Sequence, residues 1–292
     1  MKTLVIGATG NVGSQVVREL LRRGVAVRAL TRSGDKAKGL PAGVEPAVGD
    51  IGEPTILGPV FAGVDAAFML NALSKTETHE GMMGVLAARA AKLKRFVYMS
   101  VHFADRDPLI PHFASKLPVE RALAASGIPY TILRPNNFFQ NDLAARAGLL
   151  EYGVYATPLG NLGVSRVDVR DIAEAAAIAL TTDGHEGNTY NIVGPKAWTG
   201  AATAEAWGRA LGRTIQYAGD DLDAWGKAAA QWLPAWLVYD ITIMFRTFQE
   251  KGLLATAADL ERLSKLLGHA PRRFEDFASE TAAEWSATAT RR

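Results

Sequence analysis

Short apolar runs alternate with longer segments of helical periodicity through the first two thirds of the chain. The first apolar run, residues 4–6, is followed by Val12, Val16, Val17 and Leu20, which fall on one face of a helix. Alternation of this kind is typical of right-handed βαβ units on a parallel sheet. The pattern therefore predicts a parallel sheet covered by helices.

The same pattern places the remaining elements. After the first helix, which ends at Gly24, we expect strands over residues 25–30, 44–48, 66–70, 96–100 and 130–133, with helices over 56–61, 82–91 and 119–125. Beyond Pro135 the rhythm changes. We expect a helix to about Leu150, an extra strand over 164–167, an alanine-rich helix capped by Asp168 or Asp171 that ends at Leu180, and a late strand over 189–193.

Three glycines spaced three apart, Gly7, Gly10 and Gly13, separate the first strand from the first helix. A pyrophosphate approaches the backbone amides at a helix N-terminus, where a Cβ would obstruct it and the helix dipole favours negative charge. Asn11 is the expected cap of that helix. The strand before the glycines and the helix after them predict a dinucleotide-binding turn.

These elements predict a Rossmann-type, doubly wound parallel α/β fold with a smaller, mostly helical C-terminal unit. We assign residues 1–152 to the dinucleotide-binding domain, to which 164–195 return, and 196–292 to the smaller domain, with a contribution from 153–163. Ligands of open parallel sheets bind at the carboxyl edge. A helical unit at that edge would close a substrate pocket.

Arg32 follows the expected second strand, where NAD-selective folds carry an acidic residue for the ribose hydroxyls. A guanidinium there would bind a 2′-phosphate by charge-assisted hydrogen bonds, so the sequence favours NADP(H) over NAD(H). A solvated turn charge is the alternative. Asp50, after the third strand, is a candidate acceptor for the adenine amino group, or else a turn cap.

Charge and composition narrow the possible partners. The net charge is +2 over 292 residues and charges of one sign do not cluster, which favours neither nucleic acid nor an anionic membrane surface. There is no cysteine, which excludes disulfides and cysteine metal sites and fits a cytoplasmic protein. We assign no metal site. The apolar segments are too short or too interrupted for a signal peptide or a bilayer span.

A second group of candidate residues lies between Ser100 and Lys116. Ser100 ends the fifth expected strand, and His112 and Lys116 stand four apart before a helix. A reductase needs a proton donor beside the group that receives hydride, and a lysine near the nicotinamide ribose can hold the cofactor. His112, with an ordinary pKa of about 6.5, is the candidate donor. The alternatives are a packed imidazole and a surface lysine.

Aromatic residues are frequent in the C-terminal unit, which also contains a short strand candidate over 214–217. They are candidates to line a pocket for a flat, apolar substrate, or else to form the core: Trp225, Trp232, Trp236, Tyr239 and Phe245.

Taken together, the motifs resemble those of the NmrA-like branch of the atypical short-chain dehydrogenase/reductases. The carrying motifs are residues 7–13, the turn 31–33, Gly49-Asp50, residues 112–116 with Val119-Glu120, residues 131–138, and the late segment 268–277. The resemblance covers nearly the whole chain. It implies NADP(H) at the glycine turn, with Gly7, Thr9, Gly10, Asn11, Val12, Gly13, Arg32 and Asp50 as binding residues. It also implies Lys116 near the nicotinamide ribose, and Pro135, Asn137 and Phe138 beside the nicotinamide ring.

One departure bears on mechanism, because the wider superfamily uses a Tyr-x-x-x-Lys pair and this chain has His112 at the tyrosine position. Our leading hypothesis is an NADPH-dependent reductase that transfers hydride to a small conjugated or carbonyl acceptor, such as a quinone or an enone. The alternative is a non-catalytic NADP(H) sensor that acts through a protein partner. The sequence is also compatible with a homodimer.

Overall fold

The computed structural model describes residues 1–289, which divide into two compact units. The first unit comprises residues 1–135, 169–192 and 265–268. The second comprises 136–168, 193–264 and the described chain from 269 onward. Residues 136–152, assigned from the sequence to the dinucleotide-binding domain, group with the second unit.

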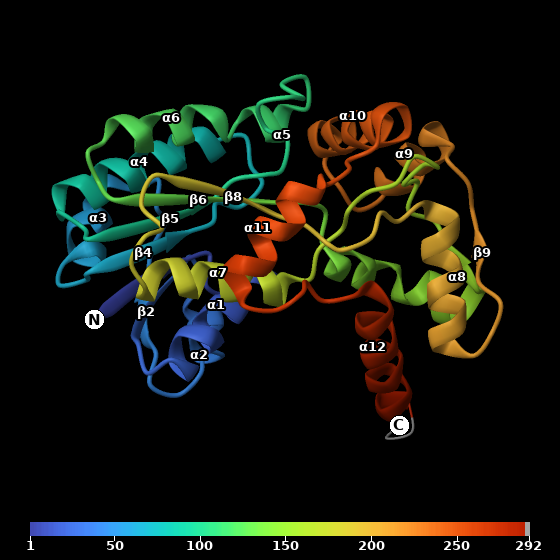
Figure 1. Ribbon diagram of the computed structural model, residues 1–292, viewed down its shortest axis with the longest axis horizontal. Coiled ribbons are helices and arrows are strands. Elements are labelled where there is room, and N and C mark those ends of the chain that lie inside the picture. Colours follow the sequence, from blue (N-terminus) through green and yellow to red (C-terminus); the bar gives the residue numbers. More distant parts are fainter. Residues whose placement is uncertain (290–292) are drawn as a thin grey trace. The chain divides into compact units, whose positions relative to one another are not determined.

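A seven-stranded parallel sheet forms the centre of the first unit (Figure 1). Its strands are β1 (Lys2–Ile6), β2 (Ala26–Thr31), β3 (Glu45–Val48), β4 (Ala66–Met69), β5 (Arg95–Met99), β6 (Tyr130–Pro135) and β8 (Asn188–Ile192). The order is β3-β2-β1-β4-β5-β6-β8, and β8, the expected late strand, pairs with β6. The doubly wound Rossmann-type sheet is thereby confirmed. Its strand order reverses between β1 and β4, the position at which such sheets bind ligands.

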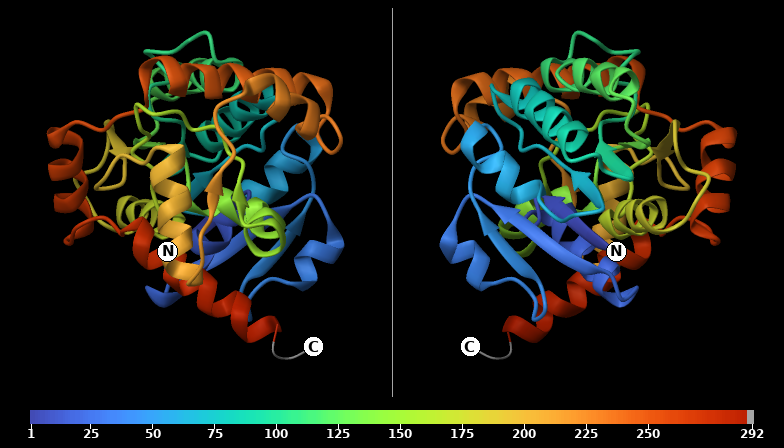
Figure 2. Two further views of the ribbon diagram at one scale, coloured as in Figure 1. Left: turned by 90° about the vertical axis from the view of Figure 1, so that its right-hand side faces the viewer. Right: turned by 90° about the vertical axis from the view of Figure 1, so that its left-hand side faces the viewer.

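Helices cover both faces of this sheet. They are α1 (Asn11–Arg22), α2 (Gly34–Lys38), α3 (Pro54–Phe61), α4 (Glu77–Ala90), α5 (Pro111–Ala114), α6 (Leu117–Ala125) and α7 (Val169–Thr181). Helices α1 and α7 pack together on one face, and α3, α4 and α6 lie along the other (Figures 1 and 2). Helix α4 starts at Glu77, before the expected start at Met82. The sequence pattern did not predict its first turn because the residues there are polar, although Glu77 and Glu80 are buried.

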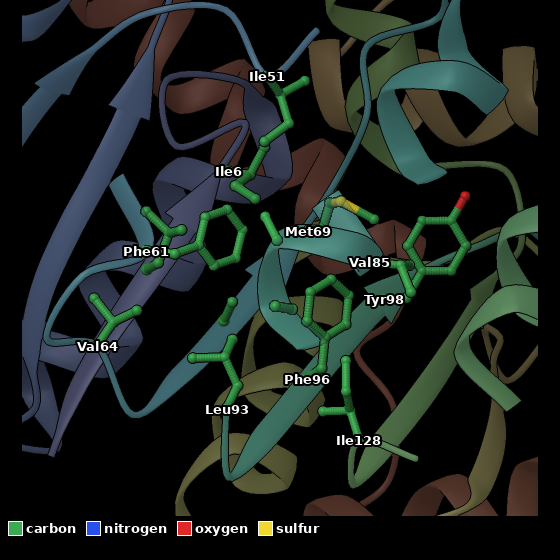
Figure 3. Close-up of a cluster of buried hydrophobic side chains, with 14 of the residues drawn as sticks. Ile6, Ile51, Phe61, Val64, Met69, Val85, Leu93, Phe96, Tyr98 and Ile128 are labelled. Carbon is green, nitrogen blue, oxygen red and sulfur yellow. The ribbon is translucent and has the colours of Figure 1, made fainter. Parts of the chain in front are cut away.

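The core of the first unit lies under α3, α4 and α6. Figure 3 shows Ile6 of β1, Phe96 and Tyr98 of β5 and Val85 of α4 within one cluster of buried side chains. The central strands are buried along nearly their whole length, as expected for parallel strands with helices on both faces. The carboxyl ends of β1, β4 and β5 therefore project from a closely packed platform.

The second unit is mostly helical. Its elements are η1 (Phe139–Ala145), η2 (Gly148–Tyr152), β7 (Val154–Tyr155), α8 (Gly200–Leu211), β9 (Gln216–Tyr217), α9 (Leu222–Ala229), α10 (Ala235–Lys251), most of α11 (Ala257–Leu267) and α12 (Phe274–Ala289). The short strands β7 and β9 pair in parallel. Aromatic rings fill its core, where Trp207 stacks on Trp285 and contacts Phe274 edge-on.

Two expectations for this unit were wrong. The segment before Leu150 forms a 3-10 turn and a π-turn instead of an α-helix, because the carbonyl of Phe138 and the carboxylate of Asp142 bond to Arg166. The expected strand over 164–167 has only isolated bridges, with Val164 paired to Trp198 and to Leu253. Among the described helices, none combines the length and apolar character needed to cross a membrane.

Candidate functional site

The glycine turn connects β1 to α1 at the point where the strand order reverses. Gly7 has a φ of +82°, and Gly10 caps α1 in an extended conformation. The expectation that Asn11 caps the helix was wrong. Asn11 is the first helical residue, and the amide of Ser14 bonds to the Gly10 carbonyl at 3.0 Å. The first backbone amides of α1 therefore lie directly beside the glycine turn.

The three glycines differ in how much space surrounds the position that a Cβ would occupy. A Cβ on Gly13 would lie 2.1 Å from the Gly7 carbonyl oxygen, and one on Gly7 would lie 2.7 Å from the Leu70 oxygen. A Cβ on Gly10 would meet only the Gly7 oxygen, at an ordinary 3.5 Å. The fold itself therefore requires Gly7 and Gly13, whereas the protein leaves space at Gly10.

A pocket of about 300 Å³ opens beside this turn, entirely within the first unit. Its lining residues come from the ends of β1, β2, β3 and β4 and include Gly7, Thr9, Gly10, Arg32, Ser33, Lys36, Asp50 and Asn71. Val12, in contrast, is buried in the core, so only its backbone is available to a ligand. The pocket brings together five of the residues predicted to bind the cofactor, namely Gly7, Thr9, Gly10, Arg32 and Asp50, whereas Asn11 and Gly13 do not line it.

Arg32 and Asp50 both line the pocket and form a loose, exposed ion pair. The side chain of Arg32 is 61% exposed and its Nη1 is 4.0 Å from Asp50 Oδ2. The other oxygen of Asp50 accepts the amide of Gly52 at 2.9 Å, so this carboxylate also stabilises a turn. Lys36 lines the same pocket, a second cation that the sequence analysis missed although it follows Arg32 by four residues.

Two buried polar side chains at the carboxyl edge have no hydrogen-bond partner among the described residues. They are the amide of Asn71, after β4, and the hydroxyl of Ser100, after β5. Buried polar groups are normally paired, so such atoms point to a polar ligand or water. Together with the open Gly10 and the cations near Arg32, they fit a dinucleotide whose nicotinamide end extends along this edge. Asn71 was missed, although its position after an apolar strand was readable.

Lys116 is buried and anchored by a carboxylate that the sequence analysis did not identify. Its Nζ pairs with Glu77 at the start of α4, and Ser115 Oγ lies 3.0 Å from the second oxygen of Glu77. Lys116 is only 7% exposed, so it is not the surface lysine considered as an alternative. No sequence motif links Glu77 to Lys116, because the two are brought together by the packing of α4 against α6.

His112 lies in α5, a single turn before Lys116. Its ring packs edge-on against Phe113 with centroids 4.8 Å apart, and its carbonyl accepts a hydrogen bond from Ser115 Oγ at 2.9 Å. The side chain is half-buried. Packing of this kind is consistent with a structural imidazole as well as with a proton donor, and the role of His112 stays a prediction.

Of the three residues assigned to the nicotinamide ring, Pro135 ends β6, and Asn137 and Phe138 belong to the second unit. There the fully buried Arg166 donates to Asn137 Oδ1 at 3.1 Å and to the Phe138 carbonyl at 2.9 Å. Its remaining donors bind Asp142, at 2.6 and 3.1 Å. Arg166 and Asp142 thus hold the segment after β6, a function that their sequence positions did not reveal.

The aromatic residues proposed for a substrate pocket differ in burial. Phe245 is buried and contacts Trp225 edge-on, with centroids 5.0 Å apart. Trp232 and Tyr239 are largely exposed, at 67% and 69%, and Trp225 and Trp236 are half-buried. Phe245 therefore contributes to the core of the second unit, whereas the other four keep some of their surface accessible.

Comparison with known proteins gives a consistent result. The NmrA-like family model matches residues 1–278. The NAD(P)H azoreductase of Xenophilus azovorans is 33% identical over 286 residues, which is 97% of this chain and 99% of the relative. The NADPH-dependent quinone oxidoreductase QOR2 of Escherichia coli, solved with NADPH, aligns with a TM-score of 0.84 and 28% identity over 96% of this chain and 99% of that one.

The triphenylmethane reductase of a Citrobacter species, solved with NADP(H), aligns with a TM-score of 0.83 and 28% identity over 96% of this chain and 99% of that one. By sequence and by fold alike, the chain belongs to the NmrA-like family.

Proposed function

We propose that this protein is an NADPH-dependent reductase that transfers hydride to a small, conjugated or carbonyl acceptor of the quinone, enone or dye type. The observation that carries the proposal is the set of buried polar side chains at the carboxyl edge, namely Asn71, Ser100 and the Glu77–Lys116 pair. A fold that only needed stability would not leave Asn71 and Ser100 without partners. Support also comes from relatives named as reductases of azo compounds, quinones and triphenylmethane dyes.

In this proposal the pocket beside Gly10 binds the adenosine and diphosphate parts of NADP(H). The first amides of α1 face the diphosphate, and Arg32 with Lys36 binds the 2′-phosphate. Lys116 donates hydrogen bonds to the nicotinamide ribose, and Pro135, at the end of β6, lies against the ring. Bound NADPH would supply the hydride. One proton, from His112 or from water, completes the two-electron reduction of the acceptor.

The direct test follows NADPH absorbance with a panel of quinones, enones, aldehydes and azo or triphenylmethane dyes. We expect turnover by the wild-type protein and a loss of about 100-fold or more in Lys116→Ala, in the range of general acid–base and positioning effects. If His112→Phe retains full activity, water supplies the proton.

The sensor function that the sequence also allows has a distinct signature in this assay. Tight NADPH binding without oxidation of NADPH by any acceptor would contradict the reductase and favour the sensor. A sensor needs no proton donor, which would explain why position 112 lacks the tyrosine of the wider superfamily. Sedimentation of the same preparation tests the expected homodimer.

Substitution of Gly10 tests whether this glycine is required for folding stability or for NADPH binding. Because a Cβ at this position meets only an ordinary contact in the protein, Gly10→Ala is expected to fold with a stability within about 1 kcal/mol of wild type. The same Cβ would face the diphosphate, so the Kd for NADPH should rise at least about tenfold, or about 1.4 kcal/mol. Thermal unfolding and fluorescence titration with NADPH measure the two effects.

Substitutions at two further glycines serve as controls for this result. Gly58→Ala, in α3, has no atom within 4 Å of the new Cβ and should leave both stability and NADPH affinity near wild type. Gly13→Ala should disturb folding, since its Cβ would overlap the Gly7 carbonyl. Unchanged NADPH affinity in a folded Gly10→Ala protein would contradict binding of the diphosphate at this turn.

A further inference from the structure

The carboxylate of Glu77 joins the first turn of α4 to the residues that precede α6. It is 1% exposed, and its two oxygens contact Lys116 Nζ and Ser115 Oγ. A second bond, from Thr78 Oγ1 to the Ser115 carbonyl at 2.9 Å, fastens the same two segments. The carboxylate therefore binds the candidate active-site lysine and the residue beside it at once.

Burial makes the charge of Lys116 depend on this partner. An ammonium group with little access to water favours the neutral amine unless an opposite charge lies within a few ångströms. Glu77 supplies that charge and occupies one of the three N–H donors of Lys116. The two others are left for groups at the carboxyl edge, where the nicotinamide ribose is proposed to lie.

The other titratable groups nearby do not replace Glu77. Glu120 of α6 binds Arg134 of β6, at 2.6 Å, and Glu80 of α4 accepts from Thr76 at 2.6 Å. Tyr98 of β5 is fully buried, and Figure 3 shows its hydroxyl pointing away from Val85 and Phe96 at the edge of the cluster. Burial, and then the charges of Glu77 and Glu120, raise the pKa of Tyr98 well above its usual value, so it stays neutral.

We propose that Glu77 is a positioning residue for Lys116. It holds Lys116 Nζ in place beside a negative charge, so that the remaining N–H donors of Lys116 are presented to the cofactor ribose. This inference rests on the proposed function for the contact between Lys116 and the ribose. It adds a residue outside the glycine, Arg32 and His112–Lys116 motifs that positions the lysine of the site.

The test measures the NADPH dissociation constant of wild type, Glu77→Gln and Glu77→Asp at neutral pH. Glu77→Gln keeps the shape of the side chain but removes the charge that holds Lys116, so the Kd should rise about tenfold or more, as expected for loss of a charge-assisted hydrogen bond. Glu77→Asp retains the charge and should rescue most of this loss.

Glu120→Gln is the matched control. Glu120 is a buried carboxylate with a cationic partner, but that partner is Arg134 and not Lys116, so the Kd for NADPH should stay near that of wild type. Circular dichroism restricts the comparison to folded protein. A wild-type Kd in Glu77→Gln, or an equal loss in Glu120→Gln, would overturn the proposal.

A measurement on the wild type covers the case in which Glu77→Gln does not fold. In protein labelled with ¹³C at lysine Cε, the Lys116 resonance, identified by its loss in Lys116→Met, should shift when NADPH binds. An unchanged Lys116 resonance at saturating NADPH would contradict the contact that Glu77 is proposed to position. Both readouts are independent of turnover, so failure of the reductase assay leaves this proposal to be decided by its own data.

Discussion

Replacing Arg166 with methionine is expected to lower the free energy of unfolding of the second unit by about 3–5 kcal/mol, the cost of leaving a buried charge without its partner. Arg166 and Asp142 are each 1% exposed. The carboxylate of Asp142 also accepts hydrogen bonds from Trp207 Nε1, at 2.8 Å, and from Tyr155, at 3.0 Å. Methionine fills much of the same volume but leaves Asp142 negatively charged in the core.

The network is electrostatically self-consistent in the wild type. Burial disfavours the charge of Arg166, but the carboxylate of Asp142 outweighs it and raises the pKa of Arg166 above its usual value. Removal of either member therefore strands the other. Asp142→Asn should also destabilise the unit, and the double substitution Arg166→Met/Asp142→Leu should cost less than the sum of the single ones, because no charge is then stranded.

Urea unfolding followed by tryptophan fluorescence measures this effect selectively. All six tryptophans of the chain, at 198, 207, 225, 232, 236 and 285, lie in the second unit. Arg209→Met is the control, since Arg209 forms an exposed pair with Glu205 on α8 and such a pair contributes about 0.3–0.5 kcal/mol. Equal midpoints for the two variants would show that the Arg166 network does not stabilise the unit.

Replacing Arg32 with alanine should raise the Kd for NADPH by about 10- to 150-fold and leave that for NADH nearly unchanged. The range corresponds to about 1.5–3 kcal/mol for hydrogen bonds to a charged group. Arg32 is well placed for this role, because it lines the pocket beside the glycine turn and its side chain is 61% exposed. The 2′-phosphate is the chemical difference between the two cofactors.

Parallel titrations with NADPH and NADH, monitored by nucleotide fluorescence, give both constants. Lys38→Ala serves as the matched control, since Lys38 is an exposed cation of α2 that pairs with Asp35 and does not line the pocket. It should change neither constant by more than about twofold, because exposed pairs contribute little. Equal losses for both cofactors in Arg32→Ala would identify Arg32 as a general contact and not as the selectivity residue.

Local patterns were sufficient for the first unit and insufficient for parts of the second. In the first, the central strands are buried on both faces and α1 has one apolar face, so periodicity located the strands and the longer helices but not the short α2 and α5. In the second, Arg166 draws the carbonyl of Phe138 and the carboxylate of Asp142 into a buried network. The segment after β6, whose sequence pattern is helical, therefore forms a 3-10 helix and a π-helix instead of an α-helix.

The Rossmann-type sheet, the glycine turn and the position of Arg32 were predictable from the amino-acid sequence, because each depends on residues close together in the chain. The tertiary structure was needed to show that Gly10 has space for a Cβ, that Lys116 is buried and that Glu77 is its partner. Glu77 and Lys116 are 39 residues apart and meet because α4 packs against α6. A charge in a buried site depends on such distant partners, which no local pattern records.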